Sequence, residues 1–243
     1  MPRVGNRADT ELLVTSYAHR GLWDRSIPEN SLAAFSQAVA RGYGIELDVR
    51  LSRDRRVMVF HDEDLLRMCG VSGKVSDYTY TELRRLRLLG TDQTIPTLEE
   101  VLALAKAKRP DIKLGVEIKE FTEENVDLTV ALLKKYGFFD NCWFYAFNAR
   151  IIKYIKTRYN GRTMGYPDFQ MQEFEADSYS YYDEMGLSMR VLRSEVADVY
   201  LGKGLPVHMY CADTKEDVEF CISKGADLIT ANDVEPLFEI LGR

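Results

Sequence analysis

Hydrophobic and polar positions alternate in short runs along most of the chain, and a longer segment with helical spacing follows most of these runs. Runs of about four to eight residues rich in branched and aromatic side chains are typical of strands. The expected strands cover residues 14–18, 44–49, 57–60, 114–119, 142–147, 163–166, 189–192, 207–211 and 227–230. Strands that alternate with helices predict a mainly parallel sheet, because a helix carries the chain back across the sheet before each new strand.

Three of the expected helices have recognisable starts. Thr97 with Glu100 forms a capping-box pattern, and Asp213 with Glu216 forms another. Pro28 suits the first turn of a helix, where its missing N–H has no intrahelical partner. These signals place the helices between the expected strands.

About eight such strand–helix units follow one another without a break in composition, and this favours a closed (β/α)8 TIM barrel over an open doubly wound sheet. The length of 243 residues agrees with one barrel domain over residues 1–243. One interval breaks the rhythm. Residues 63–95 are rich in Arg, Asp, Gly and Thr and too long for an ordinary connection, so they are expected to form a small cap insertion.

Composition narrows the classes of function. With 32 basic and 38 acidic residues the formal net charge is −6, which argues against a nucleic-acid partner or attachment to an anionic membrane. No run approaches the roughly 18 apolar residues of a membrane span, and residues 1–15 contain no apolar core of a signal peptide. The chain is therefore expected to be cytoplasmic, without a stable membrane anchor. The four cysteines lack CxxC spacing, so neither a zinc cluster nor a disulfide framework is indicated.

Candidate chemistry begins with carboxylates inside two expected strands. Glu46 and Asp48 are spaced i and i+2, so they share one face of a strand, and Glu117 shares a face with Lys119 in another. A solvent-exposed face is the simpler alternative. In a barrel, however, helices cover the outer face and side chains fill the interior, so inward carboxylates need a cation. Oxygen ligands select Mg²⁺, Ca²⁺ or Mn²⁺ over zinc.

Two of the three histidines lie where expected strands end. His19 is followed by Arg20, and His61 is followed by Asp62. Either histidine taken alone is more typical of a structural residue than of a catalyst. Together with Arg20 and Lys119, whose positive charges suit a phosphate, they indicate metal-assisted phosphoryl chemistry with one histidine as base and the other as acid.

These residues belong to a set of motifs that resembles the glycerophosphodiester phosphodiesterase family from about residue 16 to the end. The matching motifs are His19-Arg20-Gly21, Pro28-Glu29-Asn30-Ser31, Glu46-Leu47-Asp48-Val49, His61-Asp62, Pro96-Thr97-Leu98-Glu99-Glu100 and Glu117-Ile118-Lys119. The resemblance implies an enzyme, a phosphoric diester hydrolase, built on a (β/α)8 barrel with an insertion after the second strand. That position fits the interval 63–95.

The resemblance also implies a role for each site residue. Glu46, Asp48 and Glu117 would bind one divalent cation, Mg²⁺ or Ca²⁺ with Mn²⁺ also possible, His19 and His61 would be the acid and base, and Arg20 and Lys119 would bind the substrate phosphate. The implied reaction cleaves a small-molecule glycerophosphodiester to glycerol 3-phosphate and an alcohol, in lipid and glycerol metabolism. The substrate's own 2-hydroxyl would attack phosphorus, and water would then open the cyclic phosphate.

The C-terminal half departs from the family pattern. Tyr210-Cys211-Ala212-Asp213 stands where a Trp-Thr-Val-Asn run is frequent, and Thr230-Ala231 stands where Thr-Asp is usual. Asp213 is as well explained by a helix cap as by a ligand contact. The preferred alcohol, the physiological metal, the order of the two histidines and the oligomeric state stay open at this point. Two alternatives also stay open: a lysophospholipase D acting on lipids, and a catalytically silent phosphodiester-binding module.

The interval 167–186 is unusually rich in tyrosine and acidic residues and is expected on the catalytic face. Tyr181 and Tyr182 would suit a cationic head group such as choline or ethanolamine, because aromatic faces attract cations. The alternative is that these tyrosines pack the segment against the barrel.

Overall fold

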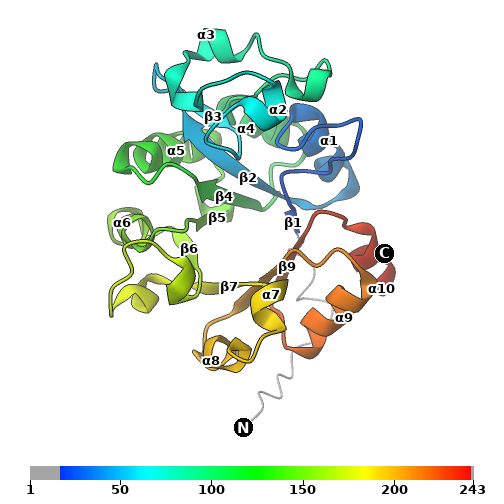
Figure 1. Ribbon diagram of the computed structural model, residues 1–243, viewed down its shortest axis with the longest axis vertical. Helices are drawn as coiled ribbons and strands as arrows, with labels where there is room; N and C mark the ends of the chain where they lie inside the picture. The colour runs from blue at the N-terminus through cyan, green and yellow to red at the C-terminus, as the bar shows by residue number, and fades with distance from the viewer. Residues whose placement is uncertain (1–16, 242–243) are drawn as a thin grey trace.

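The computed structural model describes residues 17–241, so the expected strand residues 14–16 and the N-terminal segment 1–15 lie outside the described part. Eight parallel strands form a sheet that closes when β1 pairs with both β9 and β2 (Figure 1). They are β1 (Tyr17–Ala18), β2 (Gly44–Leu51), β4 (Leu114–Ile118), β5 (Cys142–Tyr145), β6 (Arg162–Gly165), β7 (Glu184–Ser188), β8 (Val207–Tyr210) and β9 (Leu228–Ala231). The expected (β/α)8 TIM barrel is confirmed.

Helices cover the outside of this barrel. They are α1 (Leu32–Arg41), α4 (Leu98–Lys108), α5 (Glu123–Tyr136), α6 (Ala149–Tyr159), α7 (Met189–Leu192), α8 (Ala197–Leu201), α9 (Lys215–Ser223) and α10 (Glu235–Leu241). Their apolar faces and the apolar side chains of the strands form one buried core that extends from Tyr17 to Leu237. Polar side chains of the strands are buried as well, with Glu46, Asp48 and Glu117 among them.

The helix starts follow the sequence signals only in part. The capping box of Thr97 and Glu100 at α4 is confirmed. Helix α1 instead begins after Ser31, whose hydroxyl accepts a hydrogen bond from Ala34 N, so Pro28 lies before the helix. At α9 the cap is Thr214 and not Asp213, because a hydroxyl one residue later reaches the free N–H groups and releases Asp213 for another contact.

The strand expected at 189–192 is wrong. Those residues form the short helix α7, and the strand is β7, directly before it. Ser188 ends the strand and caps the helix, since its hydroxyl accepts a hydrogen bond from Val191 N. Glu184 and Gly186 hide the strand in the sequence, because neither residue is typical of a buried strand. Glu184 is tolerated in the interior beside His208, at 3.6 Å between Oε2 and Nδ1.

The connection from β6 to β7 contains two short 3-10 helices, η4 (Asp168–Gln170) and η5 (Ser178–Tyr181), in place of an α-helix. Tyr182 covers β6 where an α-helix would otherwise pack. Its ring lies on Gly165 so closely that a Cβ atom there would be 2.0 Å from Tyr182 Cζ. Tyr166 faces the interior, because the charges of Glu117, Glu46 and Asp48 act on it. Gly165, the residue before it on β6, therefore faces outward, and Tyr182 packs on the outer face of this strand.

Residues after β2 form the expected insertion. The strand β3 (Val57–Val59) pairs antiparallel with the end of β2, so the expected strand 57–60 exists but lies outside the parallel barrel. Beyond it come α2 (Leu66–Cys69), η1 (Val75–Asp77), α3 (Tyr80–Leu83) and η2 (Leu88–Gly90), which gather at one end of the molecule (Figure 1). They enclose a small apolar cluster of their own, which includes Phe60, Met68 and Leu83.

Candidate active site

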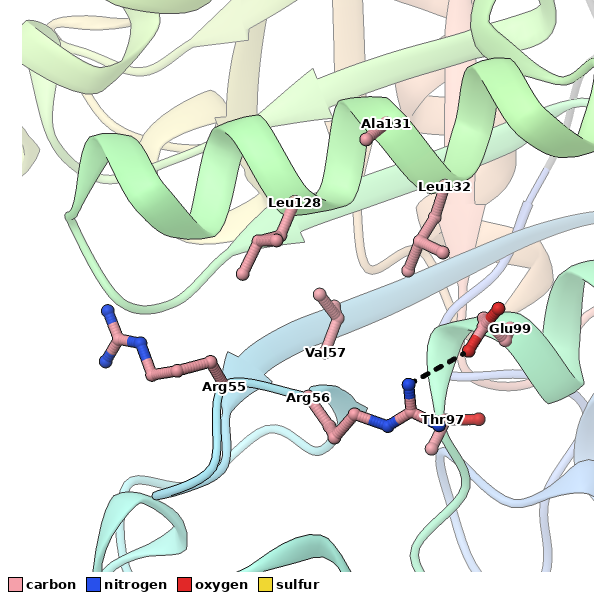
Figure 2. A pocket seen from close by; sticks show the side chains of 8 residues that line it. All are labelled: Arg55, Arg56, Val57, Thr97, Glu99, Leu128, Ala131 and Leu132. Carbon is pink, nitrogen blue, oxygen red and sulfur yellow. Dashed lines mark ion pairs between the residues drawn. The ribbon is translucent and has the colours of Figure 1, made fainter.

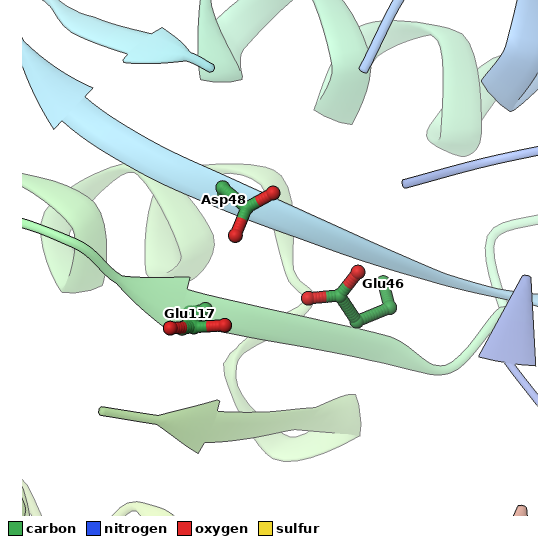
Figure 3. A group of neighbouring side chains, drawn as sticks. All are labelled: Glu46, Asp48 and Glu117. Carbon is green, nitrogen blue, oxygen red and sulfur yellow. The ribbon is translucent and has the colours of Figure 1, made fainter. Parts of the chain in front are cut away.

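Three buried carboxylates meet inside the barrel. Asp48 pairs in register with Glu117 across β2 and β4, and Glu46 lies two residues earlier on the same face of β2. One oxygen from each side chain lies within 4.8 Å of the others, and the three carboxylates face a common point (Figure 3). The alternation that the sequence showed therefore places these groups together, as expected for oxygen ligands of a cation.

Electrostatics at this point favour a positive ion. Burial, followed by the negative charges of Asp48 and Glu117, raises the pKa of Glu46. Burial alone would also raise the pKa of Asp48, but Lys119 and Arg20 lower it. Asp48 Oδ1 is buried and accepts no hydrogen bond from the residues that the structure describes. Such a set of oxygen donors fits a hard divalent cation, because the cation would satisfy that oxygen and relieve the mutual repulsion.

Two cations border the carboxylates. Lys119 Nζ donates to Glu117 Oε1 at 2.7 Å and lies 3.4 Å from Asp48 Oδ1. Arg20 Nε lies 3.5 Å from Asp48 Oδ2, while the backbone N–H of Arg20 donates to Glu46 Oε2 at 3.0 Å. Arg20 has φ = 60°, a left-handed turn at the end of β1 that brings both its backbone and its side chain to the site.

His19 follows β1 directly and has Asn232 as its partner. Its Nδ1 lies 2.6 Å from Asn232 Oδ1, and its Nε2 lies 3.9 Å from Glu46 Oε2. Asp213 accepts hydrogen bonds from both the backbone and the side-chain nitrogen of Asn232, each at 2.7 Å. An amide oxygen can only accept, so Nδ1 carries a proton and Nε2 faces the carboxylates. Sequence reasoning missed Asn232, because the chain brings it to His19 only when β9 pairs with β1.

His61 reaches the same site by a different path. β3 returns the chain along β2 until the backbone N–H of Phe60 donates to the backbone carbonyl of Asp48 at 2.9 Å. The next residue, His61, lies close enough to Asp48 for the charge of that carboxylate to act on its pKa. Its Nδ1 lies 2.7 Å from Asp62 Oδ1. Burial lowers the pKa of His61. The insertion therefore begins at a site residue.

Three aromatic rings lie together near the carboxylates, since the charge of Glu117 acts on two of them, Tyr166 and Tyr210. Phe147 and Tyr166 stack with centroids 3.9 Å apart, and Tyr166 meets Tyr210 edge to face at 5.6 Å. Tyr210 belongs to β8, where the sequence departs from the family pattern. The site therefore combines charged groups with neighbouring aromatic rings.

The expected head-group role of Tyr181 and Tyr182 does not agree with their positions. Tyr182 is buried on the outside of β6, as described above. Lys153 Nζ lies over the ring of Tyr181 at 5.0 Å, and the Tyr181 hydroxyl donates to Asp177 Oδ2 at 2.9 Å. Both tyrosines therefore already contact other groups of the protein, which agrees with the alternative that they pack this segment against the barrel.

A separate hollow lies between β3, α4 and α5 (Figure 2). It is lined by Arg55, Arg56, Val57, Thr97, Glu99, Leu128, Ala131 and Leu132. Its charges are already paired, Arg56 with Glu99 and Arg55 with Glu124. The described residues that line it include neither a histidine nor a cluster of carboxylates, so the candidate reactive groups are those in the barrel.

Buried carboxylates bracketed by a lysine, an arginine and two histidines would be a poor site for a neutral carbonyl, but they suit an anionic ester. The class of protein that this barrel and this site define is a phosphodiesterase.

Comparison with known proteins agrees with this class. Residues 19–235 match the glycerophosphoryl diester phosphodiesterase family. A glycerophosphodiester phosphodiesterase of Caldanaerobacter subterraneus subsp. tengcongensis is 29% identical over 246 residues, with 92% of this chain and 96% of the relative covered. A lysophospholipase D of Homo sapiens is 32% identical over 144 residues, 54% of this chain and 44% of its own.

The barrel also resembles a solved structure of an Oleispira antarctica phosphodiesterase in complex with the product sn-glycerol-3-phosphate. Its TM-score is 0.80 at 20% identity, with 93% of this chain and 96% of that chain covered. The chain thus belongs to the glycerophosphoryl diester phosphodiesterase family. The expectation of an enzyme of this family is confirmed. Among the described residues, no helix has the length and hydrophobicity that a bilayer crossing requires.

Proposed function

We propose that this enzyme hydrolyses small glycerophosphodiesters to glycerol 3-phosphate and an alcohol, with a divalent cation and a pair of histidines. The observation that carries the proposal is the convergence of three buried carboxylates within 4.8 Å of one another, with His19, His61, Arg20 and Lys119 around them. The Oleispira antarctica phosphodiesterase, whose structure holds glycerol 3-phosphate, supports this choice of product.

Each protein group then has a defined role. Arg20 and Lys119 bind the phosphate oxygens and stabilise the negative charge that builds up in the transition state. One of the two histidines removes the proton from the attacking glycerol hydroxyl, and the other protonates the departing alcohol. His19 is suited to either role, because its Nε2 points toward the carboxylates while its Nδ1 is held by Asn232.

Glu46, Asp48 and Glu117 would hold the cation. Three carboxylates, with Asp48 Oδ1 free of hydrogen bonds from the described residues, fit Mg²⁺ or Ca²⁺, with Mn²⁺ as a further candidate. When bound, such an ion polarises a phosphate oxygen and lowers the pKa of a hydroxyl group beside it.

The test is the release of glycerol 3-phosphate from a panel of glycerophosphodiesters, measured with Mg²⁺, Ca²⁺ and Mn²⁺ and with excess chelator. We expect turnover that chelator abolishes and that a divalent ion restores. Undiminished turnover in excess chelator would refute the proposed metal dependence. Absence of product with every substrate and ion, together with calorimetric binding of the diester, would instead identify a silent binding module.

A lysophospholipase D activity is the second candidate, and the similarity to the human lysophospholipase D favours it. The same assay separates the two. A lysophospholipid hydrolysed faster than its deacylated analogue would make the lipid the preferred substrate.

We further propose that the chain acts as a single barrel domain over residues 1–243, with residues 63–95 as a cap insertion. The continuous core from Tyr17 to Leu237 supports the first part, and the separate apolar cluster of the insertion supports the second.

A further inference from the structure

Arg67, on helix α2 of the insertion, makes an unusual set of contacts beside the site. Its Nε donates to Asp62 Oδ2 at 2.6 Å and its Nη2 to Asp62 Oδ1 at 3.0 Å. Its Nη1 donates to Glu29 Oε2 at 3.1 Å and its Nη2 to Glu29 Oε1 at 2.7 Å. One guanidinium therefore grips two carboxylates, each with a bidentate pair of hydrogen bonds.

Each of these carboxylates has a second partner in the site. Asp62 Oδ1 lies 2.7 Å from His61 Nδ1, and Glu29 Oε1 accepts a hydrogen bond from Arg20 Nη1 at 2.9 Å. Arg67 is thus linked by hydrogen bonds to two site residues, to His61 through Asp62 and to Arg20 through Glu29. Asp62 is close to Arg67 in sequence, but Glu29 is 38 residues away, so only the fold creates this junction.

The charges in the junction are held in their ionised forms. Burial alone would raise the pKa of Asp62, but hydrogen bonds with Arg67 and His61 lower it to about 2. The same opposition holds at Glu29, where Arg67 and Arg20 outweigh burial and lower the pKa. Both carboxylates are therefore anionic at neutral pH and can orient the groups that donate to them.

We propose that Arg67 is a positioning residue for the phosphodiester reaction, which fixes His61 through Asp62 and Arg20 through Glu29. The inference rests on the proposed function, because it assumes that His61 transfers a proton and that Arg20 binds the phosphate. It also gives the insertion a part in the reaction, since helix α2 supplies the group that locks two site residues in place. A displacement of about 1 Å at such residues can cost about 10²-fold in rate.

The central variants are Arg67→Ala and Arg67→Lys, with Arg53→Ala as the matched control. Arg53 also joins the barrel to the insertion, through Glu82 Oε2 at 3.0 Å and the carbonyl of Asp77 at 2.8 Å, and its side chain is exposed to a similar degree, 55% against 47%. Within the described part of the chain, its hydrogen bonds do not include a site residue. We expect kcat/KM to fall about 10²-fold in Arg67→Ala and to stay within about twofold in Arg53→Ala. Lysine should not restore activity, because a single ammonium cannot make two bidentate pairs.

Chemical rescue separates positioning from a merely structural role. The exposed side chain leaves room for a small cation, so millimolar guanidinium should restore part of the activity of Arg67→Ala, whereas methylammonium at equal ionic strength should not. The contacts through Asp62 and through Glu29 should have different kinetic effects. Asp62→Asn should mainly lower kcat, and Glu29→Gln should mainly raise KM. These two variants keep the test open if Arg67→Ala does not fold.

Three outcomes would overturn the inference while leaving the proposed function in place. In the first, Arg67→Ala is as active as Arg53→Ala, and in the second, Arg67→Lys is fully active. In the third, both Asp62→Asn and Glu29→Gln have unchanged kinetics. Failure of the proposed function has a different signature, since the unaltered enzyme itself would then release no glycerol 3-phosphate.

Discussion

The two histidines of the site differ in the group that holds Nδ1. His19 has the neutral amide of Asn232 at 2.6 Å, whereas His61 has the carboxylate of Asp62 at 2.7 Å. Burial lowers the pKa of His61, whereas at His19 burial is outweighed by hydrogen bonds with Cys211 and Asn232, which raise the pKa. The pair is therefore chemically unequal, which is what a reaction that needs one acid and one base requires.

Replacing either histidine should remove turnover and leave the fold nearly intact. His19→Ala and His61→Ala should each lower kcat by about 10²- to 10⁴-fold, because a positioned acid or base typically contributes that much. Neither side chain is proposed as a cation ligand, so titration with a divalent ion should give nearly the normal affinity. Near-normal turnover in either variant would remove that histidine from the acid and base pair.

Asp62 gives a pH dependence of stability with a definite sign. Its pKa of about 2 in the folded protein lies below the ordinary value near 3.9. The stabilisation it provides is therefore complete above about pH 4 and is lost as the pH falls through about 2. The gap in Tm between the unaltered protein and Asp62→Asn should be constant from pH 7 to about 5 and then shrink toward pH 2. A gap that does not change with pH would show that the charge of Asp62 does not contribute.

At the scale of elements, two irregular connections build the site and its wall. The β2–β3 hairpin extends beyond the barrel and turns back, so that Val59 pairs with Val49 and His61 arrives next to Asp48. The connection after β6 contains 3-10 helices in place of an α-helix, and Tyr182 covers the outer face of the strand. Both features depend on local contacts that an ideal strand–helix repeat would not contain.

The covering role of Tyr182 can be tested at Gly165. A methyl group there would lie 2.0 Å from Tyr182 Cζ, so Gly165→Ala should destabilise the protein by about 1–3 kcal/mol through overpacking. Combining it with Tyr182→Leu should cost less than the sum of the two single changes, because leucine leaves room for the methyl group. Denaturant unfolding of the four proteins gives this coupling, and strictly additive changes would contradict the contact.

At the scale of the whole molecule, a bound cation would tie neighbouring strands of the barrel together. The proposed ligands come from β2 and β4, which pair along five residues. An ion that binds only the folded state stabilises it by about 2.7 kcal/mol at a concentration 100 times its Kd. For a chain of this size that corresponds to a rise in Tm of roughly 5–10 °C.

The variant Glu46→Gln should distinguish cation binding from the repulsion between the three carboxylates. Without added ion its Tm should be higher than that of the unaltered protein, because one of three clustered carboxylates is gone. With saturating Mg²⁺ or Ca²⁺ its increase in Tm should be much smaller, because a ligand is gone. Differential scanning fluorimetry with and without the ion measures both effects. An equal rise in both proteins would exclude Glu46 from the coordination shell.

Local patterns in the sequence were sufficient for the barrel and for most of the charged groups of the site. Inward-facing Glu46, Asp48 and Glu117 follow from the two-residue period of strands, and strands alternating with helices predict a parallel barrel. The same reasoning placed a strand at 189–192 and missed β7, because Glu184 and Gly186 contradict local strand preference while the interior of the barrel accommodates them. Only the tertiary structure determined that Asn232 and Arg67 contact the site. Asn232 meets His19 because β9 pairs with β1. Arg67 reaches Glu29 because the insertion folds against the barrel. Such contacts join residues far apart in sequence, and no local period or spacing encodes which distant residue will face a given side chain.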